Sequence, residues 1–507
     1  MSARRGGQEE YHRGGLSRRE LLKSGVMAAV AAGSPLVRLG QRRGNAGQEG
    51  PIDMRRGAQP LTVQPILVYS VPRRVEGRSW RSWGSIQSEE AAEEEATRIR
   101  AELEALAQRA DFRMAIQPVV RMSSVEQVQR LVASAADVTL VYAAGGWIPE
   151  LNAACETGRW AIVFVRYKSG PYYLWHEIAD SRFLRAHTDR VQHPKVSLED
   201  VVVDDQDELL WRLRALFGLK NVLGSRIVCV GGPGGWETPE APQRARERFQ
   251  LQMITVPIPE MEELIRAARK DRTFLARCGK EADAYISGES VTLRVTREAV
   301  AECFLLKNLF KQLMDQNGAW AVTTRDCMNS YAGIMPCLTL TLLNDDGFMA
   351  YCEGDFVVIP AGMLLHFISG KPTYFCNPTL PAAGKMLFAH CTAPRRMDGY
   401  YLEPVELVTH YESDHGAATH VLFRRGQEMT IVKPDFEARH WLVATGSILD
   451  TPWLDTCRAQ VEVSLHADTQ EVLHSLRGFH CMLAYGDYRK EMQYAARKVG
   501  IDVQVLA

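Results

Sequence analysis

The chain has little that would support a disulfide or zinc framework. Its eleven cysteines are scattered over 507 residues, without a Cys-x-x-Cys pair or a regular spacing. Small disulfide-rich domains and zinc fingers both need such spacing, so both are excluded. Cys229, Cys352 and Cys376 stand inside short apolar runs, where a free thiol behaves as a small core residue.

An excess of one charge is also missing. Sixty Lys and Arg residues oppose 61 Asp and Glu residues, which gives a net charge of −1, and 46% of the chain is hydrophobic. This composition is typical of a globular protein of several domains. No basic surface for nucleic acid is expected beyond the first sixty residues. The apolar segment 26–32 is too short for a stable membrane span.

The sequence lacks a phosphate-binding loop. Gly231-Gly-Pro-Gly-Gly-Trp236 follows an apolar run, but it is not Gly-x-Gly-x-x-Gly and has no following Lys-Ser/Thr. Pro233 also removes one backbone donor. We therefore interpret this stretch as a tight turn that lets the backbone approach a ligand or a neighbouring domain, and we expect no nucleotide site.

The N-terminus has the pattern of an export signal. Ser17-Arg-Arg-Glu-Leu-Leu-Lys23 is close to the twin-arginine motif, and the apolar segment 26–32 follows it. We predict a signal and tail at 1–45, a linker at 46–60, and a periplasmic or extracellular location. The alternative is a basic disordered tail on a cytoplasmic protein. No clear Ala-x-Ala cleavage site follows the motif.

From Leu61 onward, apolar runs of strand length alternate with amphipathic helical patterns. Such alternation predicts parallel sheets covered by helices on both faces. Beyond His390 the pattern changes to short strands without intervening helices, which predicts an antiparallel sheet or barrel. The expected fold class is α/β: doubly wound domains at 61–222 and 223–384, and then a β-rich domain at 385–507.

Polar residues follow three successive strand-like runs. Phe348 to Cys352 leads to Glu353 and Asp355, Pro372 to Cys376 leads to Asn377, and Lys385 to Ala389 leads to His390. Between them, 357–368 has helical spacing and stops at Gly370. Open α/β sheets bind ligands at the carboxyl ends of their strands, so we predict a site here. The alternative is that Glu353 and Asp355 only cap the following helix.

The stretch from about 298 to 507 resembles the L-fucose and L-arabinose isomerases. The Glu-x-Asp at 353–355, the helix that ends at Gly370, and a histidine near the C-terminus, His480, follow the layout of that family. The resemblance implies an L-fucose isomerase-like fold and a divalent metal, usually Mn²⁺. It implies Glu353, His390, His480 and Asn377 as metal ligands, with Glu353 and Asp355 as catalytic residues. Asn377 departs from the family, which has an acidic ligand there.

The same resemblance implies a homo-oligomer, a trimer or hexamer, in which one subunit covers the active site of the next. The loop Gly170 to His176 would then help to close a neighbouring site. We expect Trp175 and His176 to contact a small-molecule carbohydrate, together with Asn377.

Three functions remain open at this stage. The first is an isomerase that moves a proton between C1 and C2 of an aldose through an enediol. The second is a related metal-dependent epimerase or lyase, and the third is a catalytically silent, exported sugar-binding protein. Asn377 can bind a metal through its amide oxygen, but it cannot transfer a proton. Either Asp355 takes the second proton-transfer role or the chemistry differs.

Overall fold

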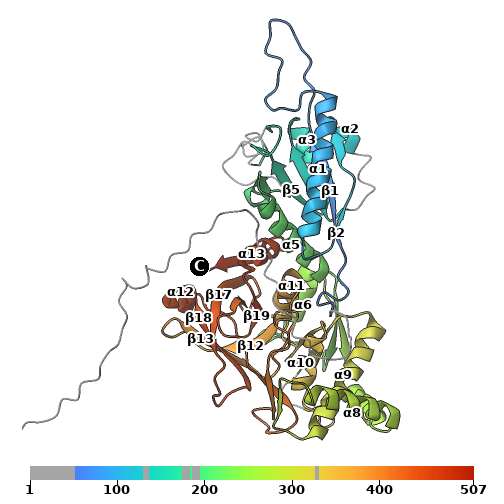
Figure 1. Ribbon diagram of the computed structural model, residues 1–507, viewed down its shortest axis with the longest axis vertical. Coiled ribbons are helices and arrows are strands. Elements are labelled where there is room, and N and C mark those ends of the chain that lie inside the picture. The colour runs from blue at the N-terminus through green and yellow to red at the C-terminus, as the bar shows by residue number, and fades with distance from the viewer. Residues whose placement is uncertain (1–51, 129–135, 174–182, 185–194, 326–329, 507) are drawn as a thin grey trace, which may run out of the picture. The chain divides into compact units, whose positions relative to one another are not determined.

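The computed structural model describes residues 52–128, 136–173, 183–184, 195–325 and 330–506, and residues from Pro51 onward form one compact unit (Figure 1). The predicted signal segment, Trp175 and His176 lie outside the described residues. None of the helices in the described ranges combines the length and the apolar character needed to cross a membrane.

The first sheet is entirely parallel, as the alternation of strands and helices predicts. Its strands run in the order β2-β1-β4-β5-β6, and β3 also pairs with β1. The strands β4 and β5 are buried at every position, as expected where helices cover both faces. The strands are β1 (Leu61–Val68), β2 (Met114–Ile116), β3 (Val120–Met122), β4 (Val138–Ala143), β5 (Trp160–Val165) and β6 (Val201–Val203), and the helices are α1 (Glu89–Arg109), α2 (Val125–Val128), α3 (Ile148–Cys155) and α5 (Gln206–Val222).

A second parallel sheet has the order β11-β10-β7-β8. Helix α9 begins at an N-cap, Thr296, whose side chain accepts from Ala299 N, and ends at Gly318 with φ +58°. Helix α11 likewise ends at Gly370 with φ +64°, the predicted stop. The elements are β7 (Arg226–Val230), β8 (Gln252–Val256), β10 (Ala321–Thr324), β11 (Met349–Tyr351), α6 (Ala241–Phe249), α7 (Ile258–Ala268), α8 (Arg272–Ile286), α9 (Arg297–Asn317), α10 (Cys337–Asp345) and α11 (Ile359–Ser369).

The C-terminal part forms the predicted antiparallel barrel, drawn in orange to red in Figure 1. Its strands follow the order β16-β19-β12-β13-β18-β17, and β17 pairs back with β16 to close the ring. Strand β20 pairs with β17 in parallel. The elements are β12 (Tyr374–Pro378), β13 (Lys385–His390), β16 (Glu428–Pro434), β17 (His440–Asp450), β18 (Ala459–Leu465), β19 (Cys481–Tyr485), β20 (Asp502–Val505), α12 (Thr469–Ser475) and α13 (Arg489–Arg497).

The strand arrangement corrects one step of the sequence argument. Asn377 and His390 were expected at the carboxyl ends of strands that continue the parallel sheet of Glu353. Strands β12 and β13 instead pair antiparallel to each other, inside the barrel. Short buried strands read alike in parallel and antiparallel sheets, so their apolar pattern could not distinguish the two. A small separate sheet holds β14 (Val405–Val408) between β15 (Ala418–Val421) and β9 (Val291–Leu293).

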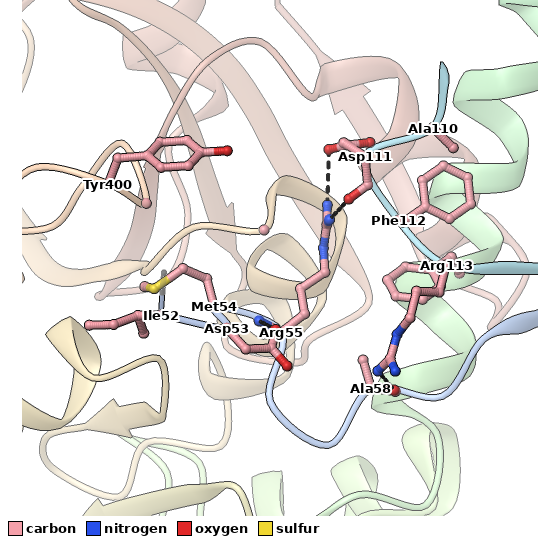
Figure 2. A pocket seen from close by; sticks show the side chains of 13 residues that line it. Ile52, Asp53, Met54, Arg55, Ala58, Ala110, Asp111, Phe112, Arg113 and Tyr400 are labelled. Atoms are coloured by element: carbon pink, nitrogen blue, oxygen red, sulfur yellow. Dashed lines mark hydrogen bonds and ion pairs between the residues drawn. The ribbon is translucent and has the colours of Figure 1, made fainter. Parts of the chain in front are cut away.

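The first described residues line part of a cavity of about 520 Å³ through Ile52, Asp53, Met54, Arg55 and Ala58. Figure 2 shows the side chain of Arg55 reaching Asp111, with Nη2 3.1 Å from Oδ2. The same guanidinium donates to the carbonyl oxygens of Phe367 and Ile368, both at 2.9 Å, at the end of α11. The last residues of the predicted linker are thus tied to the helix that follows Asp355.

Helices α5 and α11 approach each other closely at Gly218. A Cβ atom at this position would lie 2.4 Å from Cγ1 of Ile368. Such a contact forces the helices apart, so we expect Gly218→Ala to lower the free energy of unfolding by about 1–3 kcal/mol. Gly279→Ala is the matched control, because Gly279 lies within α8 and its Cβ would meet only Arg297 Nη2, at 3.4 Å. Because alanine has a higher helix propensity than glycine, Gly279→Ala should leave the free energy of unfolding unchanged or raise it by up to about 1 kcal/mol. Denaturant unfolding of both variants tests the difference, and equal midpoints would contradict it.

Candidate functional site

Glu353 stands on a tight turn directly after β11. Its φ is +64° and that of Gly354 is +58°, so two successive residues adopt the left-handed conformation. The amide of Gly354 donates to Thr323 Oγ1 at 3.2 Å, which ties the turn to the neighbouring strand β10. The Glu353 side chain is 12% exposed and reaches the barrel. A residue in this conformation is uncommon outside glycine and is enriched at functional sites.

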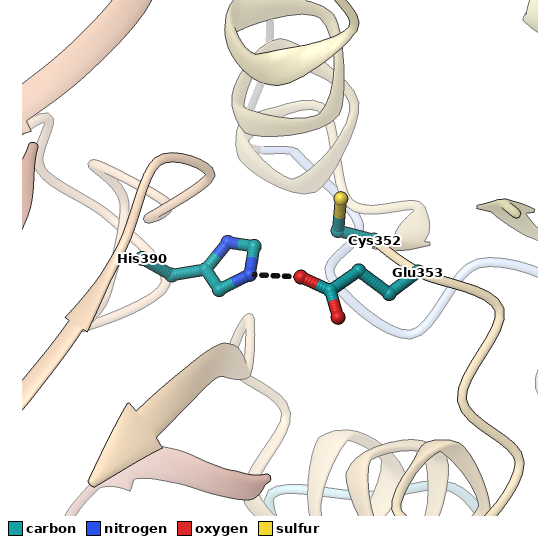
Figure 3. Close-up of side chains that lie close together, drawn as sticks. All are labelled: Cys352, Glu353 and His390. Atoms are coloured by element: carbon teal, nitrogen blue, oxygen red, sulfur yellow. Dashed lines mark hydrogen bonds and ion pairs between the residues drawn. The ribbon is translucent and has the colours of Figure 1, made fainter. Parts of the chain in front are cut away.

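Two imidazoles from the barrel meet the two oxygens of this carboxylate. His390 Nε2 lies 3.1 Å from Glu353 Oε1, and His480 Nε2 lies 3.2 Å from Oε2. Figure 3 shows the ring of His390 directed at Glu353. Both histidines are buried. The structure therefore brings together three of the predicted ligands from β11, β13 and the start of β19.

The opposite ring nitrogens are fixed by other side chains. His480 Nδ1 lies 2.7 Å from Asp355 Oδ2, and His390 Nδ1 lies 3.1 Å from Thr392 Oγ1. Because a carboxylate only accepts hydrogen bonds, Asp355 places the proton of the neutral His480 ring on Nδ1. The lone pair of Nε2 then faces Glu353. This carboxylate–histidine arrangement is the usual support of a metal-binding imidazole.

Asp355 is fully engaged. Besides His480, it accepts hydrogen bonds on Oδ1 from the amides of Trp236 and Val357, at 3.1 and 3.0 Å. The side chain is 2% exposed. Its bond to Val357 organises the chain just before α11, but the N-cap of this helix is Val358 and no side chain caps it, so the capping alternative is not confirmed.

Charge around the site shifts two pKa values in opposite directions. Burial opposes ionisation of Glu353, yet hydrogen bonds and attraction from His390 and His480 bring the pKa of this carboxyl far below its usual range. Burial likewise opposes protonation of His480, but its bonds to Asp355 and Glu353 raise the pKa of the ring to about 9. Glu353 is thus ionised at any working pH, and the two carboxylates together favour a positive charge between them.

The glycine-rich turn at 231–236 builds one wall of the site. The amide of Gly234 donates to Gly354 O at 2.9 Å, and Phe356 N donates to Gly234 O at 3.0 Å. The turn therefore brings its backbone against the loop that holds Glu353, which agrees with our interpretation of it as a close backbone approach. Its last residue, Trp236, stacks on Phe479 with ring centroids 4.5 Å apart and meets His480 edge-on at 5.5 Å.

Asn377 lies on the barrel beside these residues. Cys376 pairs with Cys481 across β12 and β19, so Asn377 and His480, which flank this pair, stand at the same rim. Within the described residues, Oδ1 of Asn377 is a buried atom that forms no hydrogen bond. Buried polar atoms rarely go without a partner, so this oxygen points to a ligand. Carboxylate, imidazole and amide oxygen together form a donor set that suits Mn²⁺ or a similar divalent ion.

Sequence reasoning missed several members of the site. Cys352 offers a sulfur close to Glu353 and His390, so that these three residues alone could hold an ion (Figure 3). Thr324 Oγ1 lies 3.8 Å from this sulfur, and the sequence indicated only a core thiol. Thr392 could have been proposed from the sequence as a partner of His390, because it stands only two residues further along the chain. No sequence pattern could have indicated Trp236 or Phe375, because both reach the site through tertiary contacts. The ring of Phe375 lies 4.4 Å from that of His480 and 5.0 Å from that of His390.

Comparison with known proteins gives one informative similarity. No protein-family profile matches the chain. A sulfoquinovose isomerase from Clostridium sp. (strain MSTE9) is 24% identical over 266 residues, which cover 50% of this chain and 58% of that protein. The chain thus matches somewhat more than half the length of this relative. With the α/β fold, its antiparallel barrel and the buried Glu–His cluster, the sequence is similar to that of a sugar isomerase.

Proposed function

We propose that this protein is a metal-dependent isomerase that interconverts an aldose and a ketose. The proposal rests mainly on the convergence of His390 Nε2 and His480 Nε2 on the two oxygens of Glu353. The similarity to a sugar isomerase supports the same reaction class.

A divalent cation would be held by Glu353, His390 and His480, with the amide oxygen of Asn377 as a further ligand. When bound, such an ion acts as a Lewis acid on the sugar carbonyl. Asp355 keeps His480 in the tautomer that presents Nε2, and Thr392 orients His390. Trp236, with 42% of its surface exposed, offers an aromatic face to a sugar ring.

Proton transfer falls to Glu353 in this mechanism. Its carboxylate takes the proton from C2 of the aldose, which gives a cis-enediolate, and returns it to C1, while the hydroxyl proton of O2 passes to O1 as the ketose forms. Asp355 is occupied by three hydrogen bonds, so we assign it the positioning of His480 in place of the second proton transfer.

Ketose formation from a panel of aldoses, measured with added Mn²⁺ and after chelation, tests this function. We expect activity with the metal and loss of activity with the chelator. If the purified protein binds sugar but neither retains nor responds to Mn²⁺, Co²⁺ or Zn²⁺, the silent sugar-binding protein is the better description.

Asn377→Asp should raise aldose turnover. The change supplies a second carboxylate opposite His480, where the L-fucose isomerases that this chain resembles have an acidic ligand. It thereby adds a group able to transfer a proton. General-base catalysis contributes roughly 10²–10⁴-fold, so even a badly placed base should give a gain measurable as kcat. Asn377→Ala is the control, because it removes the amide oxygen without adding a base and should weaken metal binding. If Asp at this position lowers turnover and damages the native activity, Asn377 serves a different reaction.

Export by the twin-arginine route and assembly into a trimer or hexamer are also proposed. Cell fractionation of the full chain and light scattering of the purified protein test them. A fully active monomer would exclude a subunit arrangement in which a neighbour completes the site.

A further inference from the structure

Arg325 stands in the middle of the carboxyl edge of the second parallel sheet. It directly follows β10, the strand that lies between β7 and β11. Its amide donates to Val230 O at 2.8 Å, at the end of β7. The residue therefore lies between the glycine-rich turn after β7 and the Glu353 turn after β11. This edge is where open parallel sheets bind their ligands.

Glycines form a seat for the Arg325 side chain. A Cβ at Gly231 would lie 2.6 Å from Cβ of Arg325, and a Cβ at Gly234 would lie 3.0 Å from its Cζ. Cα of Arg325 would be 3.5 Å from a Cβ at Gly354, the residue after Glu353. The guanidinium also donates from Nη1 to Pro233 O. The glycine-rich stretch, which lacks the features of a phosphate loop, thus holds a cation flat against its own backbone.

The charge of Arg325 has no carboxylate partner among the described residues, and the neighbouring Asp326 lies outside them. Arg325 is exposed. Its seat fixes the guanidinium in advance, which lowers the entropic cost of binding a partner. Trp236 leaves the same turn and extends to His480, and Arg325 packs against Gly354, the residue after Glu353.

We propose that Arg325 binds an anionic substituent of the substrate, so that the sugar isomerised here is an acidic one. A guanidinium donates two parallel hydrogen bonds to a carboxylate, phosphate or sulfonate, and all three share this chemistry. The inference rests on the proposed function, because it takes the Glu–His cluster as the place where the sugar reacts. Arg325 is then a specificity-determining residue outside the proton-transfer machinery.

Alditols test the inference without requiring turnover, because they have no carbonyl group to isomerise. Calorimetric titration with Mn²⁺ present would compare sorbitol with sorbitol 6-phosphate, gluconate and 6-deoxy-6-sulfosorbitol. We expect at least one acidic alditol to bind the wild-type protein about 10- to 100-fold more tightly than sorbitol, as a charge-assisted hydrogen-bond pair implies. The acidic probe that binds most tightly identifies the substituent.

Arg325→Gln should remove this preference and leave the affinity for sorbitol unchanged. Arg325→Lys keeps the charge without the planar fork and should retain part of the preference. Arg294→Gln is the matched control: it removes an exposed arginine charge beside β9 and should bind like the wild type. Equal affinity of the wild type for neutral and acidic alditols, or a preference that survives in Arg325→Gln, would overturn the inference.

The two proposals fail in different ways. If acidic alditols bind through Arg325 but no aldose, acidic or neutral, is converted, the isomerase function is wrong and the anion site stands. If neutral aldoses are converted and Arg325→Gln changes neutral and acidic substrates equally, the isomerase function stands and the anion site is wrong.

Discussion

Replacing Glu353 by glutamine should abolish isomerisation and most of the metal binding. The amide keeps the shape of the side chain but removes the negative charge that faces both His390 and His480. Loss of the base alone should lower kcat by about 10²–10⁴-fold, and loss of an ionised ligand should lower metal affinity as well. Ketose formation and calorimetric Mn²⁺ titration measure the two effects.

Glu462→Gln is the matched control for this experiment. Glu462 lies on β18 of the same barrel, 34% exposed, with Lys385 Nζ 3.5 Å away. Its loss should change neither turnover nor metal affinity. Wild-type turnover in Glu353→Gln would end the isomerase proposal, whereas loss of turnover with intact metal binding would separate the base role from the ligand role.

Asp355→Asn should weaken Mn²⁺ binding by about 10- to 100-fold, the usual effect of removing the carboxylate behind a metal-binding histidine. An asparagine can still accept from Trp236 N and Val357 N, but its NH₂ group then faces Nδ1 of His480. That contact favours the tautomer with the proton on Nε2, the nitrogen that should bind the ion. Because Asp355 acts only through His480, kcat at saturating Mn²⁺ should recover to a large extent.

Asp435→Asn provides the comparison for Asp355. Asp435 is also buried and also accepts two backbone amides, those of Arg439 and His440, at 2.8 and 3.1 Å. It faces no imidazole of the site, so it should lose some stability and no metal affinity. If excess Mn²⁺ fails to restore kcat in Asp355→Asn while Glu353→Gln retains activity, Asp355 is the proton-transfer residue.

The sequence predicts the elements of this fold better than their pairing. Apolar runs of strand length were expected from Leu61 onward, and the buried strands β5 and β7 are among those found. The predicted helix stop at Gly370 is explained by its left-handed conformation. The strand β13 falls in the predicted β-rich domain, but β12 was expected in the parallel sheet before it. The connection 379–384 between these two strands is too short for a parallel crossover and was the available sign of their antiparallel pairing.

For the candidate site, too, some members were predicted from the sequence and others became evident only in the structure. Glu353, His390 and His480 were predicted from their positions around strands and from the family resemblance, and they meet in the structure. The bond of Asp355 to His480 and the wall formed by Trp236 depend on tertiary contacts that no local pattern encodes. The glycine-rich turn that holds Arg325 was recognised in the sequence, but the arginine side chain that packs on it was not.

The backbone conformation of Glu353 sets stability against function at one residue. A side chain at φ +64° costs on the order of 1 kcal/mol relative to glycine. The next position, 354, has the same left-handed conformation and is a glycine. Selection for a stable turn alone would favour glycine at 353 as well. A glutamate at 353 therefore carries a conformational cost, which is expected where its carboxylate is needed for function. Variants chosen for thermal stability alone should therefore lose this residue early, and its retention in such a screen would show that the carboxylate also contributes to folding.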